Sequence, residues 1–248
     1  MKPCFCIMGI ARSGTSLACK LFTECVNNVY CMNETEIDIN KVPRLLSETR
    51  RKLLAAEPVP NRWDGSALQS DTVRCPTPVS ERVVTGYDAD VAMGIKMAMR
   101  IERAIKLGLK VVAVVRDPVY AIASWRQAGD IVWNHVTDGD MNQMWVYENI
   151  KFEHSSRLGR QCELWEHYAR QIQMALVRHP DRVKLWRYED FTVAPQAFVD
   201  DVAEFIGCSP KAAPDLSCLN LPWRFDELDR IADAVERLCP SRGGFDYA

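Results

Sequence analysis

The sequence predicts an α/β fold of three layers, in which helices cover both faces of a mostly parallel central sheet. Two observations support this prediction. Short apolar segments alternate with longer segments of helical periodicity along most of the chain, as expected for repeated strand and helix units. In addition, residues 110–115 form a nearly continuous β-branched run, which is typical of a strand buried on both faces of a parallel sheet.

A loop that contains two glycines separates the first predicted strand from the first predicted helix. Residues 4–8 form a short apolar run that ends at Gly9. Helical periodicity begins after Gly14 and places Leu17 and Leu21 on one face. The order at the N-terminus is therefore strand, glycine loop and helix.

Another strand and helix precede the buried run at 110–115. Residues 91–96 predict the strand and residues 101–107 the helix. Gly108 ends this helix, because glycine readily adopts the left-handed conformation that follows a helix.

The buried run leads into a further helix. Asp117 is suited to cap this helix and Pro118 to be its first residue, and the pattern continues toward Gly129. The remaining predicted elements are a helix at 157–177, a strand at 183–187 and an amphipathic helix at 195–206 that Gly207 stops.

Length and charge restrict the class of protein. A chain of 248 residues with 48% hydrophobic residues predicts one domain over residues 1–248. The 31 Lys and Arg residues against 33 Asp and Glu residues give a net charge of -2, without a basic run that would follow a phosphate backbone. We therefore expect no nucleic-acid partner. Both a monomer and a homodimer are compatible with the sequence.

The cysteines and the N-terminus predict the compartment. The ten cysteines form no Cys-x-x-Cys motif and keep no metal-ligand spacing with the four histidines, so we expect reduced core cysteines and no metal site. Arg12 interrupts the apolar N-terminal stretch, and no apolar window is long enough to span a membrane. These features favour a cytoplasmic protein without a membrane anchor.

Two longer stretches interrupt the alternation of strands and helices. Residues 57–80 are rich in Pro, Ser and Asp, and residues 130–154 carry several aromatic side chains, including Trp133 and Trp145. Because long insertions in compact domains are often lids or binding loops, we expect both stretches on the acceptor side of a binding site. Ordinary core packing explains the aromatic residues equally well.

The loop from Gly9 to Ser16 has the spacing of a phosphate cradle. It lies between a strand and a helix, where glycines let backbone N–H groups turn inward and the helix N-terminus favours an anion. A nucleoside-triphosphate loop has Lys after its second glycine, but Thr15 stands there and the cation is Arg12 instead. The alternative is a tight turn with an exposed arginine.

Arg116 and Ser124 form a second candidate anion site. Ser124 lies seven residues beyond Asp117, which is two helical turns, so a guanidinium and a hydroxyl could bind one phosphate together. The alternative is a local salt bridge of Arg116 and simple packing of Ser124. A third segment, residues 187–191, follows a strand, and we interpret Glu189 and Asp190 there as acids that cap a turn.

In this order the three segments resemble the sulfotransferases that use 3′-phosphoadenosine-5′-phosphosulfate (PAPS). The resemblance rests on the loop at 9–16, on Arg-Asp-Pro with a serine eight residues after the arginine, and on the Arg-Tyr-Glu-Asp-Phe segment. Ala11 stands where the family frequently has proline. The resemblance implies a P-loop-like phosphosulfate-binding loop, PAPS as sulfuryl donor and adenosine 3′,5′-bisphosphate (PAP) as product. The donor-binding residues that it implies are Gly9, Ala11, Arg12, Ser13, Gly14, Thr15, Ser16, Arg116, Ser124, Tyr188 and Arg242.

The same resemblance implies the catalytic residues. Arg12 would neutralise the leaving phosphate and Lys96 would hold the sulfuryl oxygens, and no metal ion is demanded. Some family members place a histidine two residues after this lysine, but the chain has Ala98 there. Others use a glutamate after the first helix, so we expect Glu34 or Glu36 to be the base, with Glu34 preferred.

The C-terminal residues 241–244 weakly resemble a family segment over the 3′-phosphate, which would give Arg242 its role. We nevertheless expect a flexible tail there. The acceptor implied is a hydroxyl or amine of a small molecule or glycan.

Two other functions fit parts of the sequence. The run that ends at Asp117 also suits a small-molecule kinase with Mg-ATP, although the missing lysine at Thr15 counts against it. A binding protein that kept the fold and lost the base is the third possibility.

Overall fold

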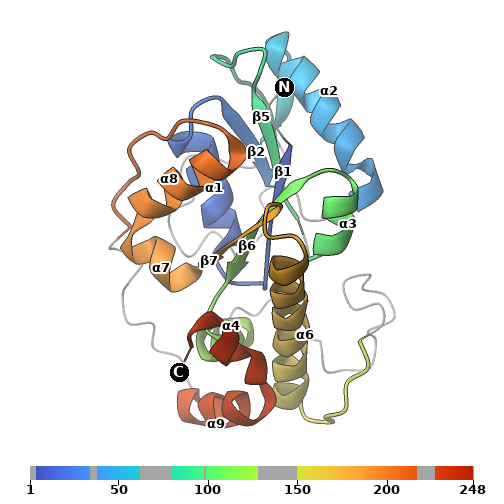
Figure 1. Ribbon diagram of the computed structural model, residues 1–248, viewed down its shortest axis with the longest axis vertical. Coiled ribbons are helices and arrows are strands. Elements are labelled where there is room, and N and C mark those ends of the chain that lie inside the picture. The colour runs from blue at the N-terminus through green and yellow to red at the C-terminus, as the bar shows by residue number, and fades with distance from the viewer. Residues whose placement is uncertain are drawn as a thin grey trace.

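The computed structural model describes residues 4–33, 38–61, 80–97, 99–127, 150–216 and 227–247. Its centre is a five-stranded sheet in which each neighbouring pair of strands is parallel (Figure 1). The strands in spatial order are β2 (Val29–Asn33), β5 (Ala92–Lys96), β1 (Phe5–Gly9), β6 (Lys110–Val115) and β7 (Val183–Arg187).

Helices cover both faces of this sheet, which confirms the predicted α/β fold (Figure 1). On one face lie α1 (Thr15–Cys25) and α8 (Pro195–Ile206), with the short helix α7 (Tyr188–Val193) beside them. On the other face lie α2 (Val42–Leu54), α3 (Ile101–Lys106) and α6 (Arg157–Arg178).

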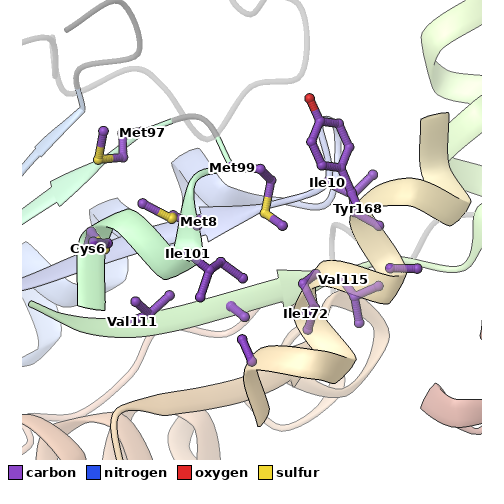
Figure 2. Close-up of a cluster of buried hydrophobic side chains, with 14 of the residues drawn as sticks. Cys6, Met8, Ile10, Met97, Met99, Ile101, Val111, Val115, Tyr168 and Ile172 are labelled. Atoms are coloured by element: carbon purple, nitrogen blue, oxygen red, sulfur yellow. The ribbon is translucent and has the colours of Figure 1, made fainter. Parts of the chain in front are cut away.

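The side chains of β1 alternate between two apolar clusters, one on each face of the sheet. Phe5 and Ile7 pack with the residues of α1 and α8, whereas Cys6 and Met8 pack with those of α3 and α6. Figure 2 shows part of the second cluster, including Met8 of β1 together with Met99 and Ile101. Burial on both faces explains why β1 and β6 are almost continuously apolar.

Helices also gather where the strands end. Asp117 caps α4 (Pro118–Gln127), because its Oδ1 accepts a hydrogen bond from the Val119 amide at 2.7 Å. The helix α9 (Leu228–Leu238) packs on α4 and α6 and leads into the 3₁₀ helix η6 (Pro240–Phe245). The C-terminal elements thus lie at the carboxyl end of β6 (Figure 1).

Most predicted elements are confirmed, and two expectations need correction. The stretch at 57–80 is not irregular at its ends, because β3 (Pro58–Asn61) pairs antiparallel with β4 (Ser80–Val83). The expected flexible tail is wrong for residues 240–247: Phe245 is buried, and Ser241 donates hydrogen bonds to Glu166 from its amide and its hydroxyl.

Within the described part of the chain, none of the helices combines the length and the apolar character needed to cross a bilayer. The eight cysteines described there are all free thiols.

Candidate functional site

The loop between β1 and α1 has a backbone suited to an anion. Arg12 adopts a φ of 65° and Gly14 a φ of 78°, both in the left-handed region. Left-handed conformation is costly for a residue with a side chain, and such strain is concentrated at functional sites. The first turn of α1 contains no acidic residue and no side-chain cap, so its amide groups can bind an anionic ligand.

Gly9 is required because β6 lies against it. A Cβ atom at this position would approach Val114 O to 2.3 Å, which is backbone and cannot move aside. Gly14 is tight for another reason, since a Cβ there would lie 2.5 Å from Cδ2 of the Tyr188 ring. The two glycines therefore hold the loop between β6 and Tyr188.

We expect Gly9→Ala to lower the free energy of unfolding by about 3 kcal/mol, because overpacking against backbone forces the strand to shift. Urea unfolding of the purified protein measures this change. Gly243→Ala is the matched control, because nothing lies within 4 Å of a Cβ added there. Equal urea midpoints for the two variants would show that β1 and β6 are not packed this closely.

The helix α4 is attached to the loop through two neighbouring side chains. Ser124 Oγ accepts a hydrogen bond from Arg12 Nε at 3.2 Å, and Trp125 Nε1 donates to Ala11 O at 2.9 Å. Trp125 is fully buried. Sequence reasoning placed Trp125 on this helix but missed its contact with the loop, which no local pattern reveals because Ala11 lies 114 residues away.

Arg116 reaches the same loop from the end of β6. Its Nη1 donates to Arg12 O at 3.2 Å, and its guanidinium carbon lies 4.6 Å from the centre of the Tyr188 ring. The side chain is buried, with 9% of the residue exposed. The structure therefore brings together Arg12, Ser124, Arg116 and Tyr188, which come from four different parts of the chain.

Two buried polar atoms in this cluster have no hydrogen-bond partner among the described residues. They are Ser13 Oγ and Arg116 Nε. An unsatisfied buried polar group costs about 1–3 kcal/mol, so these atoms fit a ligand that carries acceptor oxygens. A phosphate or phosphosulfate group is such a ligand.

Asp117 lies next to this cluster and has a perturbed acidity. Burial raises the pKa of its carboxyl group, while hydrogen bonds from the backbone amides of Val119 and Tyr120 and the charges of Arg242 and Arg116 oppose the rise. Arg242, which belongs to η6, thus lies close enough to the end of β6 for its charge to act on the Asp117 carboxyl group.

The remaining predicted site residues are placed as follows. Lys96 is the last residue of β5 and pairs in register with Ile7 of β1; β1 lies between β5 and β6, the strand that leads to Arg116. Thr15 and Ser16 begin α1, and Thr15 is buried. Glu34 and Glu36 lie outside the described residues, as do residues 130–149 of the expected acceptor insertion at 130–154.

Glu189 does not have the role that the sequence indicated. Instead of capping a turn, its carboxylate joins two distant segments: Oε1 accepts a hydrogen bond from the Asp117 amide at 3.1 Å, and Oε2 accepts one from the Tyr247 hydroxyl at 2.8 Å. Asp190 pairs with Arg187 at 2.6 Å. No local pattern could reveal the contact of Glu189, because its partners lie 72 and 58 residues away.

Comparison with known proteins gives one family. A family model described as a sulfotransferase domain matches residues 2–226. A comparison with curated proteins gives no match.

Similar solved structures are sulfotransferases. A sulfotransferase from Alicyclobacillus acidocaldarius aligns with a TM-score of 0.52 and 19% identity, over 100% of this chain and 97% of that chain. At this identity the similarity establishes the fold. A sulfotransferase domain from the curacin biosynthetic pathway gives a TM-score of 0.49 and 14% identity over 95% and 98% of the two chains. A mouse sulfotransferase complexed with PAP gives 0.45 and 10% identity over 95% and 64%.

Proposed function

Since the chain belongs to the sulfotransferase domain family and is an enzyme of sulfuryl transfer, we propose that its donor is PAPS. The proposed acceptor is a hydroxyl or amine group of a small molecule or glycan. The observation that carries the donor assignment is the cluster of Arg12, Ser124 and Arg116 around one loop, because it offers two cationic groups to two separate anions.

We assign the two ends of the donor to two parts of this cluster. The 5′-phosphosulfate would lie on the loop from Gly9 to Ser16, where the α1 amides and Arg12 supply donors. The 3′-phosphate would lie between Arg116 and Ser124, with Arg242 adding charge from η6. The Tyr188 ring, already stacked on Arg116, offers an apolar surface beside them.

The chemistry required of the protein is positioning and charge stabilisation. PAPS supplies the sulfuryl group, which passes in line to the acceptor oxygen or nitrogen by analogy with phosphoryl transfer. Arg12 and the amides at the start of α1 would stabilise the negative charge that develops on the departing phosphate. Lys96, at the end of the adjacent strand β5, would hold the sulfuryl oxygens.

The structure offers no comparable support for a kinase. Asp117, which a kinase would need as a ligand for magnesium, instead caps α4 with a 2.7 Å hydrogen bond from the Val119 amide. The position after Gly14 is Thr15, which lacks the charge of the P-loop lysine.

The acceptor must lose a proton, and we propose Glu34 as the base with Glu36 as the alternative. We expect Glu34→Ala to lower kcat by about 100-fold, since a general base contributes about 10²–10⁴ to the rate. Glu36→Ala then leaves kcat nearly unchanged. Both variants are assayed with the best acceptor of a screen. A loss below about tenfold in both variants would place the base elsewhere.

The experiment that tests the proposed function is transfer from labelled PAPS. The purified protein is incubated with PAPS labelled in the sulfuryl group and with a panel of phenols, alcohols, amines and oligosaccharides. We expect a labelled product together with PAP, in equal amounts and without added metal. Labelling of the panel from ATP rather than from PAPS would contradict the proposal.

A further inference from the structure

Side chains hold both polar groups of the peptide unit between Arg116 and Asp117. The carbonyl oxygen of Arg116 accepts a hydrogen bond from Trp165 Nε1 at 3.2 Å, and the amide of Asp117 donates to Glu189 Oε1 at 3.1 Å. Trp165 comes from α6 and Glu189 from α7. The peptide plane that sets the direction of the Arg116 side chain is thus fixed from two sides.

Both of these side chains touch the C-terminal segment, which we define as residues 240–247. The Phe245 ring meets Trp165 edge-on, with ring centres 6.1 Å apart and planes at 87°. The Tyr247 hydroxyl donates to Glu189 Oε2 at 2.8 Å. Burial and then the charge of Glu189 raise the pKa of the Tyr247 phenol, so this hydroxyl remains a donor at neutral pH.

The C-terminal segment is itself well anchored. Arg187 Nη1 donates to the backbone carbonyls of Phe245 and Asp246, at 3.1 and 3.4 Å. Gln173 donates to Ser241 O at 2.8 Å, and Glu166 accepts two hydrogen bonds from Ser241. Phe245 and Tyr247 are buried against this framework, so the segment can transmit its position to Trp165 and Glu189.

We propose that Glu189 and Tyr247 are positioning residues that orient Arg116 for the 3′-phosphate, and that the C-terminal segment is a structural part of the donor site. This inference rests on the proposed function, because it assigns the 3′-phosphate to Arg116. Neither residue touches the donor in this proposal. Glu189 acts through the Asp117 amide, and Tyr247 acts through Glu189.

Changes at the two positioning residues should weaken binding of the 3′-phosphate more than binding of the rest of the donor. Loss of the contact frees the peptide unit to rotate and moves the Arg116 guanidinium. The loop at residues 9–16 then loses at most the hydrogen bond from Arg116 Nη1 to Arg12 O, and it keeps its hydrogen bonds with Ser124 and Trp125. Affinity for PAP should fall, whereas affinity for AMP, which lacks the 3′-phosphate, should stay the same. A purely structural role would lower stability without changing the ratio of the two affinities.

The test is isothermal titration of PAP and AMP into the full chain and four variants. We expect Tyr247→Phe and Glu189→Ala to lower the ratio of PAP affinity to AMP affinity by about tenfold, the effect of one lost hydrogen bond at the upper end of its range. Glu189→Gln should restore most of the ratio, because its amide can accept from Asp117 and donate to the Tyr247 oxygen. Tyr87→Phe, the matched control, removes a hydroxyl from a tyrosine that packs on Tyr30.

The outcomes separate this inference from the function on which it rests. If the wild-type protein binds PAP no more tightly than AMP, the proposed donor site is wrong and the inference with it. If the wild-type protein prefers PAP and both disruptive variants keep that preference, the inference alone is overturned. Tyr247→Phe removes a single oxygen atom, so the ratio of PAP affinity to AMP affinity can be measured in this variant even if Glu189→Ala does not fold.

Discussion

Replacing Arg116 with alanine is expected to weaken PAP binding by about 100-fold, since charge-assisted hydrogen bonds contribute about 1.5–3 kcal/mol each. The guanidinium is buried beside the loop, with its Nη1 on Arg12 O and its Nε free of any partner among the described residues. A phosphate would satisfy that buried donor, and alanine would leave the phosphate without it. AMP binding should change little. Isothermal titration of both nucleotides measures the effect.

Two further variants make the Arg116 result specific. Arg116→Lys keeps the charge but not the planar fork of donors, so it should recover only part of the affinity. Arg44→Ala removes an exposed arginine that pairs with Glu48 on α2, and we expect wild-type affinity for both nucleotides. Equal losses for PAP and AMP in Arg116→Ala would show that Arg116 supports the fold rather than the 3′-phosphate.

Replacing Arg12 with alanine is expected to lower kcat by about 10²–10³, the usual effect of removing one donor that stabilises developing charge. Arg12 lies in the loop at a φ of 65°, and its side chain reaches Ser124 across the cluster. In the proposed arrangement, this position would lie between the two phosphates. Affinity for PAP should fall less than kcat, because the α1 amides remain. The rate of PAP formation from PAPS measures kcat, and isothermal titration of PAP measures the affinity for comparison.

The Arg12 variant needs a check on the backbone, since Arg12 occupies a left-handed conformation that strains most residues. Arg12→Gly relieves that strain and removes the same charge, so it should lose as much turnover as Arg12→Ala. Turnover close to that of the wild-type protein in Arg12→Gly would mean that the Arg12 side chain takes no part in catalysis.

The sequence predicts β6, the strand that leads to Arg116, because burial on both faces leaves a continuous apolar run. The run at 110–115 and the strand at 183–187 coincide with β6 and β7. The helix at 195–206 coincides with α8, where Pro195 and Gly207 mark the two ends. These signals are local, so they can be seen without tertiary structure.

Other elements had a readable signal that was not assigned. In α9 the apolar residues Leu228, Ile231, Val235 and Leu238 follow helical spacing, and the pattern would have predicted the helix. The strand β2 is different, because its five residues are Val, Tyr, Cys, Met and Asn, of which only Val29 is β-branched, and they show no alternation. Only its pairing with β5 identifies it as a strand.

The sequence also predicts the residues of the candidate site better than their connections. It indicated Arg12 and Arg116 from their positions after strands and Ser124 from its place two helical turns beyond Asp117, but it placed Ser124 with Arg116 alone. The structure pairs Ser124 with Arg12, 112 residues away. It also places the C-terminal segment against Trp165, where Phe245 buries its ring. The two glycines just before Phe245 had favoured a flexible tail instead.

The most direct test is a titration of the unmodified protein with three nucleotides: PAP, AMP and Mg-ATP. Recognition of one nucleotide through two separate anions predicts that PAP binds at least about tenfold more tightly than AMP, since the 3′-phosphate adds at least one charge-assisted hydrogen bond. It also predicts no gain in PAP affinity from magnesium. Tighter binding of Mg-ATP than of PAP, or equal binding of PAP and AMP, would contradict it.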